Sequence, residues 1–173
     1  MFTSHYWETV NLRLITENNI SMKLIFFSLL VFIFFACQRN KTGEVESAMK
    51  RYDQFILSMQ PDSLMTCFLP DGKLGGEGQS AIVGQDSIRI FLKSFQGAKV
   101  LKNESTSSKI EINGEVAHQM GEYQQVIVLL EKGDTLQLTG HFDATWIEVE
   151  KSVWKLKTMY TSNYTNRKYS EVR

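Results

Sequence analysis

The sequence has few cysteines and few prolines, no excess of charge of either sign, and no apolar run long enough to cross a membrane comfortably. Only Cys37 and Cys67 occur, which excludes a fold held together by several disulfides. Lysine and arginine together number 19, as do aspartate and glutamate, so we expect no nucleic-acid partner. The histidines and cysteines show no metal-ligand spacing, so we expect neither a metal nor a cofactor.

The remaining composition is that of one folded domain. A chain of 173 residues has room for a single core, and its 43% hydrophobic and 12% aromatic residues argue against disorder. Its 11 glycines suit a domain with several turns.

The most apolar stretch lies near the beginning of the chain and ends at a cysteine. Residues 24–36 are apolar except for Ser28, and about a dozen residues are too few for a spanning helix but typical of a signal-peptide core. Lys23 supplies the positive charge that precedes such a core. The ending Phe34-Phe35-Ala36-Cys37 resembles a bacterial lipobox, in which the cysteine is lipidated and becomes the new N-terminus.

This resemblance implies a protein of the bacterial cell envelope that is bound to the membrane through a lipid on Cys37. Gln38 stands where an inner-membrane retention signal has aspartate, which favours the outer membrane, facing the periplasm. We expect residues 1–21 to be an over-extended start before Met22, residues 22–36 a lipoprotein signal peptide and residues 37–43 a lipidated tether. A membrane-anchor helix that is never cleaved is the alternative. Residues 44–164 are expected to form the domain and residues 165–173 a polar tail.

Three helices are predicted in the first half of the domain. Apolar residues recur every three or four positions, as on one face of an amphipathic helix, at Val45, Met49, Tyr52, Ile56 and Met59. Pro61 opens a second short helix that is expected to end at residues 70–72. Gln85 or Asp86 begins a third helix, whose apolar stripe is Ile88, Phe91, Leu92 and Phe95. Between the second and third helices, residues 73–84 are read as a glycine-rich turn between short strands.

Beyond Gly97 apolar and polar residues alternate, as in strands with one buried face. Turn signals occur at residues 113–114, 132–134 and 150–151, so four long antiparallel strands are expected. Three helices followed by four strands predict an α+β domain, in which helices pack on one face of a curved sheet.

Three motifs resemble one superfamily: FLPDGKL at 68–74, AIVGQDSIRIFLKSF at 81–95 and GHFDATWIEVEKSVWKLK at 140–157. Together they are similar to the SnoaL-like branch of the nuclear transport factor 2-like superfamily, over roughly residues 44–164. The resemblance implies a cone-shaped curved antiparallel sheet, with about four long strands plus short ones, wrapped around three N-terminal helices, the cystatin-like fold. It also implies a pocket at the open end. The superfamily includes ketosteroid isomerase-like and polyketide cyclase-like enzymes as well as binding and dimerisation modules, so fold leaves function open.

Strand alternation predicts which side chains face that pocket. If residues 150–151 form the tight turn, Thr145 pairs with Leu156, Asp143 with Thr158 and His141 with Tyr160. The residues expected to line the pocket are Tyr123, Thr145, Trp154 and Thr158, with Tyr52 either packing in the core or closing over the pocket. Asp143 and His141 are then candidate general bases, with Tyr160 as a hydrogen-bond donor. A register error of one residue is the alternative, and it would place His141 and Asp143 on the solvent face.

The same register places Phe142 and Trp146 on the outer face of the sheet, where they predict a homodimer interface. The alternative is that the tether or the tail covers Trp146. His118 is expected on the outer face, and Cys67 as a buried, unreactive thiol.

We therefore expect a lipid-anchored module that binds an unknown small molecule. The alternatives are an isomerase- or cyclase-type enzyme and a structural dimerisation domain.

Overall fold

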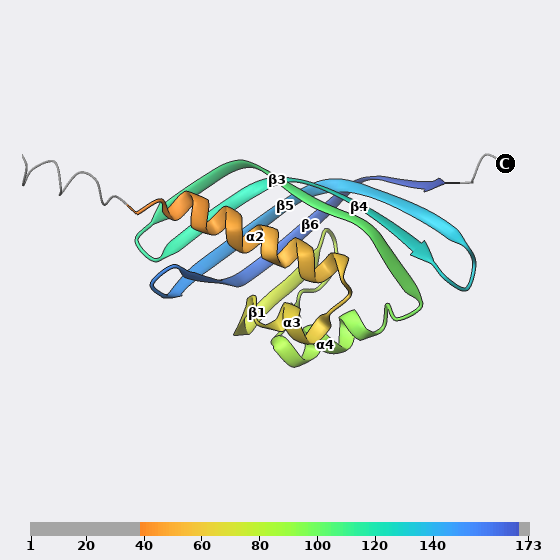
Figure 1. Cartoon of the computed structure of the whole chain (residues 1–173), viewed down its shortest axis with the longest axis horizontal. Helices are drawn as coiled ribbons and strands as arrows, with labels where there is room; N and C mark the ends of the chain where they lie inside the picture. The colour runs from red at the N-terminus through yellow and green to blue at the C-terminus, as the bar shows by residue number, and fades with distance from the viewer. Residues whose placement is uncertain (1–38, 170–173) are drawn as a thin grey trace, which may run out of the picture. The chain divides into compact units, whose positions relative to one another are not determined.

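The structure is a computed structural model that describes residues 39–169, with side chains described as far as Ser162. The expected signal peptide, Cys37 and the last four residues lie outside the described residues. The elements, labelled as in Figure 1, are α2 (Lys41–Leu57), α3 (Pro61–Met65), β1 (Phe68–Gly76), β2 (Ile82–Val83), α4 (Gln85–Lys93), β3 (Ala98–Asn113), β4 (Val116–Leu129), β5 (Asp134–Glu150) and β6 (Val153–Tyr169).

The three predicted helices are present. Asn40 caps α2, because its side-chain oxygen accepts a hydrogen bond from the Gly43 amide at 3.0 Å. Val45 and Met49 of the predicted stripe are buried. The second helix is shorter than expected: α3 ends at Met65, and residues 70–72 belong to β1. Residues 70–72 do not end a helix because the chain has already joined the sheet before them. The Cys67 carbonyl accepts a hydrogen bond from the Leu156 amide of β6 at 2.7 Å.

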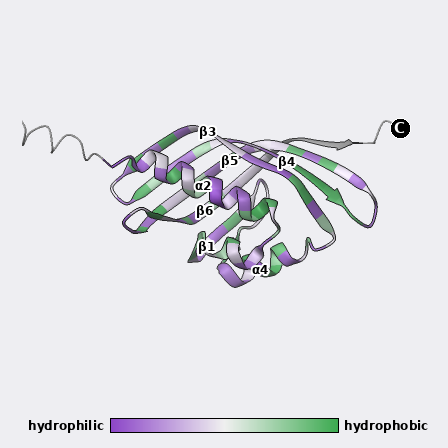
Figure 2. Ribbon diagram, in the orientation of Figure 1, coloured by the Kyte–Doolittle hydropathy of each residue, from purple (hydrophilic) through white to green (hydrophobic). Residues whose placement is uncertain are grey.

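The strands form one sheet in the order β2-β1-β6-β5-β4-β3. The four long strands are antiparallel as predicted, but β1 pairs with β6 in parallel, so the sheet is mixed. Helix α2 lies against one face of the sheet, and α3 and α4 lie below the C-terminal half of α2 in this view (Figure 1). Hydrophobic and hydrophilic residues alternate along the strands (Figure 2), and the fold is the curved-sheet α+β arrangement expected from the sequence.

The three predicted turns also form, each with a residue of positive φ. Gly114 (φ 61°) and Gly133 (φ 67°) provide it in the first two turns, where glycine carries no steric penalty. The third turn is displaced by one residue from its predicted place. Glu150 pairs with Val153, so the turn consists of Lys151 and Ser152, and Ser152 has the positive φ of 66°.

This displacement and two irregularities change the predicted register of β5 and β6. The pairing shifts between Glu148 and Glu150, and again between Trp146 and Thr145, where Lys157 is an extra residue on β6. The observed partners are Trp146 with Leu156, and Asp143 with Tyr160. Because side chains alternate with a period of two, each bulge reverses which face the following residues occupy.

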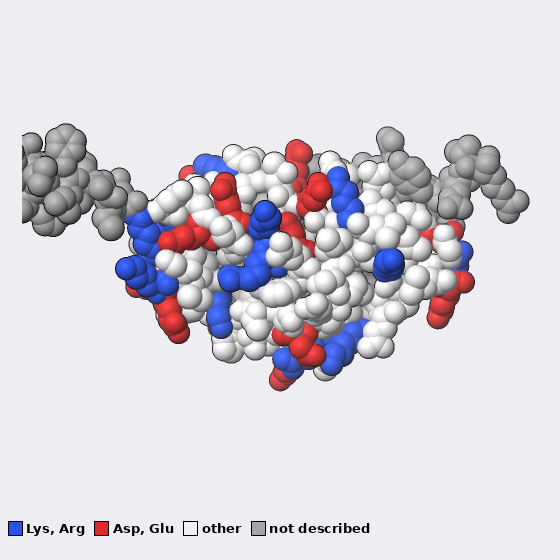
Figure 3. Space-filling model, in the orientation of Figure 1, with Lys and Arg blue, Asp and Glu red and all other residues white. Residues whose placement is uncertain are grey.

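The structure therefore corrects the predicted faces of β5. Phe142 (4% exposed) and Trp146 (0%) point into the core and cannot form the outer-face interface predicted for them. His141 and Asp143 are exposed on the opposite face. The homodimer itself stays a prediction, without those interface residues. On the face seen in Figure 3, acidic and basic side chains lie interspersed rather than in areas of one sign.

A buried polar chain connects three strands inside the core. Trp146 Nε1 donates to Gln119 Oε1 at 2.8 Å, and Gln119 Nε2 donates to Ser107 Oγ at 2.7 Å. Gln119 is completely buried and its side chain cannot reach water, so its amide group depends on Trp146 and Ser107 for hydrogen bonds.

Replacing Gln119 with leucine should leave the Trp146 N–H without an acceptor and lower the free energy of unfolding by about 1–3 kcal/mol. Urea denaturation measures this loss. Gln124→Leu on the same strand is the matched control, because Gln124 is exposed and its change should cost within about 0.5 kcal/mol. Equal stability of the Gln119 variant and the unmodified chain would contradict the role assigned to the buried chain.

Candidate functional site: a cavity between the helices and the sheet

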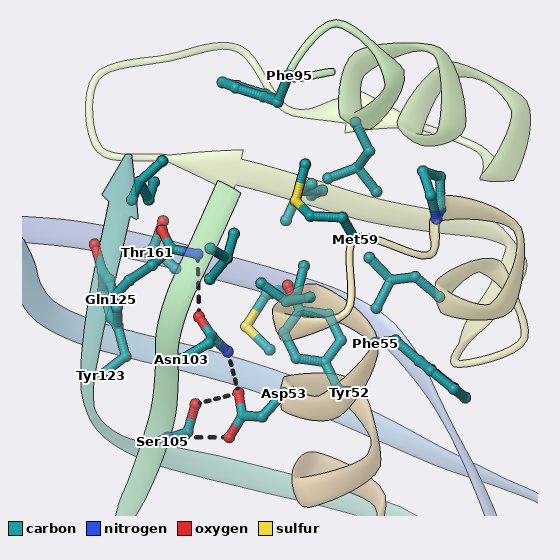
Figure 4. Close-up of a pocket in the computed structure, with 18 of the residues that line it drawn as sticks. Tyr52, Asp53, Phe55, Met59, Phe95, Asn103, Ser105, Tyr123, Gln125 and Thr161 are labelled. Atoms are coloured by element: carbon teal, nitrogen blue, oxygen red, sulfur yellow. Dashed lines mark hydrogen bonds between the residues drawn. The ribbon is translucent and has the colours of Figure 1, made fainter. Parts of the chain in front are cut away.

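A cavity of about 350 Å³ lies between the C-terminal half of α2, helices α3 and α4, and the inner face of the sheet (Figure 4). One wall is apolar and comes mainly from the helices, with Phe55, Ile56, Met59, Leu64, Phe91, Leu92 and Phe95. The other wall comes from the sheet and carries polar side chains, namely Asn103, Ser105, Tyr123, Gln125 and Thr161. An apolar pocket with a few convergent polar groups is the usual form of a small-molecule site.

Asp53 on α2 is the carboxylate among the lining residues, and it is only 8% exposed. Its Oδ1 accepts hydrogen bonds from Asn103 Nδ2 and Ser105 Oγ, both at 2.8 Å. Its Oδ2 accepts the Ser105 backbone N–H at 3.0 Å. A carboxylate oxygen has room for two such bonds, so Oδ2 retains one acceptor position.

Burial raises the pKa of Asp53 to about 6, because removal from water disfavours the charged form. The hydrogen bonds from Ser105 and Asn103 oppose this effect, and the nearby charge of Glu104 adds to it. A carboxyl group with a pKa near 6 is mostly ionised at neutral pH yet still able to take up a proton.

The side-chain amide of Gln125 holds Asn103, a hydrogen-bond partner of Asp53, in place. Gln125 Nε2 on β4 donates to Asn103 Oδ1 at 3.1 Å, so a chain of side chains leads from β4 through β3 to the carboxylate (Figure 4). These contacts fix the orientation of Asp53 and make one side of the cavity a polar surface.

Two tyrosines predicted near the pocket do line it, Tyr52 and Tyr123. Tyr52 packs edge-on against Phe68, with ring centroids 6.1 Å apart, so it belongs both to the core and to the cavity wall. Burial, with a smaller effect of the Asp53 charge, raises the pKa of the Tyr52 hydroxyl, and burial also raises that of Tyr123. Both hydroxyls are therefore neutral and able to donate hydrogen bonds at physiological pH.

The other predicted pocket residues lie elsewhere. Thr145 and Thr158 pair with each other on the outer face, and Thr145 Oγ1 lies 3.4 Å from His118 Nδ1 there. Tyr160 is 40% exposed, with its ring against Gly75. Trp154 faces inward as predicted, but at the other end of the domain, where its Nε1 donates to Glu44 Oε2 at 3.0 Å.

The predicted catalytic placement of Asp143, His141 and Tyr160 inside the pocket is therefore wrong. The extra residue Val149 between Glu148 and Glu150 puts His141 and Asp143 on the face that points away from the cavity, and the bulge at Lys157 puts Tyr160 there. Asp53 was not among the site residues predicted from the sequence, although its position in the sequence indicates a buried acid. It lies four residues after Met49 and three before Ile56, within the apolar stripe of α2, where a carboxylate is buried at a cost.

Other chemical groups in residues 39–169 give no second site. Cys67 is buried as predicted, and burial raises the pKa of its thiol. The described residues contain no group of three or more His, Cys, Asp and Glu side chains placed to hold a metal ion. No helix within the same residues has the length and apolarity needed to cross a membrane.

Comparison with known proteins places this arrangement among solved structures. The chain matches no protein-family model and no curated protein. A ketosteroid isomerase-like protein from Erwinia carotovora atroseptica superposes with a TM-score of 0.66 at 15% identity, over 74% of this chain and 99% of the other. A hexachlorocyclohexane dehydrochlorinase from Novosphingobium barchaimii gives 0.66 at 10% identity, over 76% and 92%.

A third structure carries the superfamily's own designation. A nuclear transport factor 2-like superfamily protein from Salmonella enterica serovar Typhimurium superposes with a TM-score of 0.62 at 17% identity, over 77% of this chain and 97% of the other. At such identities the likeness concerns the fold. Residues 40–169 therefore form a domain with the nuclear transport factor 2-like fold, as the three sequence motifs predicted.

Proposed function

We propose that the domain binds a small, largely apolar molecule in the cavity between α2, α4 and the sheet, with Asp53 as the group that orients it. The observation that carries this proposal is the buried Asp53 carboxylate on the polar wall of an otherwise apolar cavity. A buried charge costs folding free energy, so a fold that keeps one at a cavity wall is expected to use it.

Proton transfer by Asp53 is a second candidate function. The vacant acceptor position on Oδ2 and a pKa of about 6 suit a general base near neutral pH. Tyr123 on the same wall can donate a hydrogen bond to an oxygen on which negative charge develops. Two structures of the same fold are described as ketosteroid isomerase-like and as a dehydrochlorinase, which is compatible with such chemistry.

We also propose that the domain is held at the bacterial envelope by a lipid on Cys37, on the outer membrane facing the periplasm. The support is the short apolar core after Lys23, the lipobox-like Phe34-Phe35-Ala36-Cys37, and Gln38 in place of a retention aspartate.

Blocking the cavity should weaken binding of a molecule found by a fragment screen against the full chain. Thr161→Phe adds a ring at the cavity wall and is expected to weaken binding at least tenfold in ligand-observed NMR. Ser162→Phe adds the same ring one residue further on, where the strand pairs with His141 on the outer face, and should leave binding unchanged. Unaltered binding to a folded Thr161→Phe chain would place the ligand elsewhere and refute the proposal.

Asp53 should also make stability depend on pH. Its pKa rises from an ordinary value near 4 to about 6 on folding, so the folded chain binds the proton more tightly between these pH values. The contribution of Asp53 to stability therefore increases as pH falls from 7.5 to 5, by about 1 kcal/mol. Urea denaturation at both pH values should show this gain in the unmodified chain and in Glu46→Gln, an exposed change on the same helix, but not in Asp53→Asn.

Lipidation predicts a specific mass. Intact-mass spectrometry of the membrane-extracted protein should find an N-terminus at Cys37 with a diacylglycerol attached, and Cys37→Ser should retain its signal segment. A mature protein that begins at Met1 or Met22 would rule the anchor out.

A further inference from the structure

The charge of Asp53 has no cationic partner in the cavity. The groups that donate hydrogen bonds to it are the Asn103 amide, the Ser105 hydroxyl and the Ser105 backbone N–H, all of them neutral. No lysine, arginine or histidine is among the residues that line the cavity. Asp53 therefore differs from an ordinary buried ion pair, in which the protein itself supplies both charges.

Exposed carboxylates of the same domain do have such partners. Asp62 and Asp86 both contact Arg89, and Glu104 contacts Lys102 at 3.0 Å. The side chains of these three acids are 76%, 89% and 67% exposed, so they need a partner least. The buried side chain of Glu148 also has a cationic partner, because it pairs with Lys41 at 2.9 Å. Asp53 is buried to a similar degree, yet no lysine or arginine pairs with it among the described residues, which is unusual because buried charges are normally paired.

The rest of the cavity suits the apolar body of a cationic ligand. Six of its lining residues are aromatic, from all sides of the space: Tyr52, Phe55, Phe91, Phe95, Tyr123 and Phe142. Phe91 and Phe95 of the α4 region contact each other edge-to-face, with ring centroids 5.0 Å apart, and both remain partly exposed. Aromatic ring faces attract cations as well as apolar groups. An anion would instead meet the Asp53 charge in a poorly hydrated space.

We propose that the cavity takes an organic cation, whose ammonium group pairs with Asp53 Oδ2 and whose apolar body extends along the aromatic wall toward Phe91 and Phe95. This inference rests on the proposed binding function and specifies its ligand class. The ammonium N–H groups donate to the vacant position on Oδ2, and the side-chain oxygen of Gln125 on the same wall is a further neutral acceptor. The ligand thus supplies the counter-charge that the fold omits.

The ionisable neighbours of Asp53 keep their charge state between pH 7.5 and 5, so a change in amine affinity over this range reports the protonation of Asp53. They are Tyr52 on its own helix, Glu104 on β3 and Tyr123 on β4. Both tyrosines stay neutral through the acid range because their pKa values are raised, and Glu104 is paired with Lys102 on the surface. Between pH 7.5 and 5 a primary amine keeps its charge, while Asp53, with a pKa of about 6, loses most of its own.

Isothermal titration of the full chain with three isosteric probes tests the inference: 3-phenylpropylamine, 3-phenyl-1-propanol and 3-phenylpropanoate, each against a blank without protein. At pH 7.5 we expect the amine to bind at least tenfold more tightly than the alcohol, and the carboxylate to bind more weakly than both. Lowering the pH to 5 should weaken amine binding about tenfold and leave alcohol binding unchanged. Asp53→Asn should reduce amine affinity to that of the alcohol, whereas Glu46→Gln should not.

The outcomes separate the two proposals. If the alcohol binds as tightly as the amine, or if amine affinity is unchanged at pH 5, the cation inference is wrong while the binding function stands. If none of the three probes binds while the molecule from the fragment screen does, the cation inference is wrong and the binding function stands. If Thr161→Phe does not weaken a ligand that binds, the cavity is not the ligand site and both proposals fail. The pH series on the unmodified chain decides the matter even if Asp53→Asn does not fold.

Discussion

The hydrogen bonds between Asp53 and the Asn103–Ser105 segment join α2 to β3, and both the packing of the helix and the chemistry of the cavity depend on them. They lie where the helix passes over the inner face of the sheet. An apolar residue at position 53 would pack there at less cost, since it needs no partner. A carboxylate instead requires Asn103, Ser105 and, through Asn103, Gln125. Three residues of the polar wall, Asn103, Ser105 and Gln125, are therefore the groups that a buried acid on α2 makes necessary.

The two ends of α2 differ in how they are held. At the N-terminal end Lys41 donates to the Gly114 carbonyl at 2.8 Å and pairs with Glu148 at 2.9 Å, while Glu44 accepts hydrogen bonds from Ser152 and Trp154. These contacts fasten the helix to the turns that join the long strands. At the C-terminal end the helix faces side chains across a cavity rather than across a packed interface. Contacts at the N-terminal end and the Asp53 hydrogen bonds hold the helix in place, so it tolerates unfilled space beside its C-terminal half.

Fold and site differ in how far the sequence determines them. The stripe that includes Val45 and Met49 and the glycines at 114 and 133 are local signals, and they correctly predicted helices, strands and turns. The faces of β5 depended on the register against β6, which no local signal fixes. Ser152 rather than a glycine has the positive φ in that turn. The extra residue on β6 is Lys157, a residue type that does not indicate a bulge. The unpaired Val149 was enough to exchange Phe142 with His141 between the core and the outer face, and Lys157 had the same effect on Tyr160.

For the same reason, Asp53 is a better guide to function than the polar residues of the strands. A polar residue on an alternating strand is expected on one of its two faces, so His141 or Asp143 carries little information until the register is known. A helix has one buried stripe whose position follows from its own spacing, and Asp53 interrupts that stripe between Met49 and Ile56. Its burial costs stability above pH 6, where it is charged, and a cationic ligand would offset that cost in the same pH range. Ligand binding and the pH dependence of folding are then two consequences of one unpaired charge.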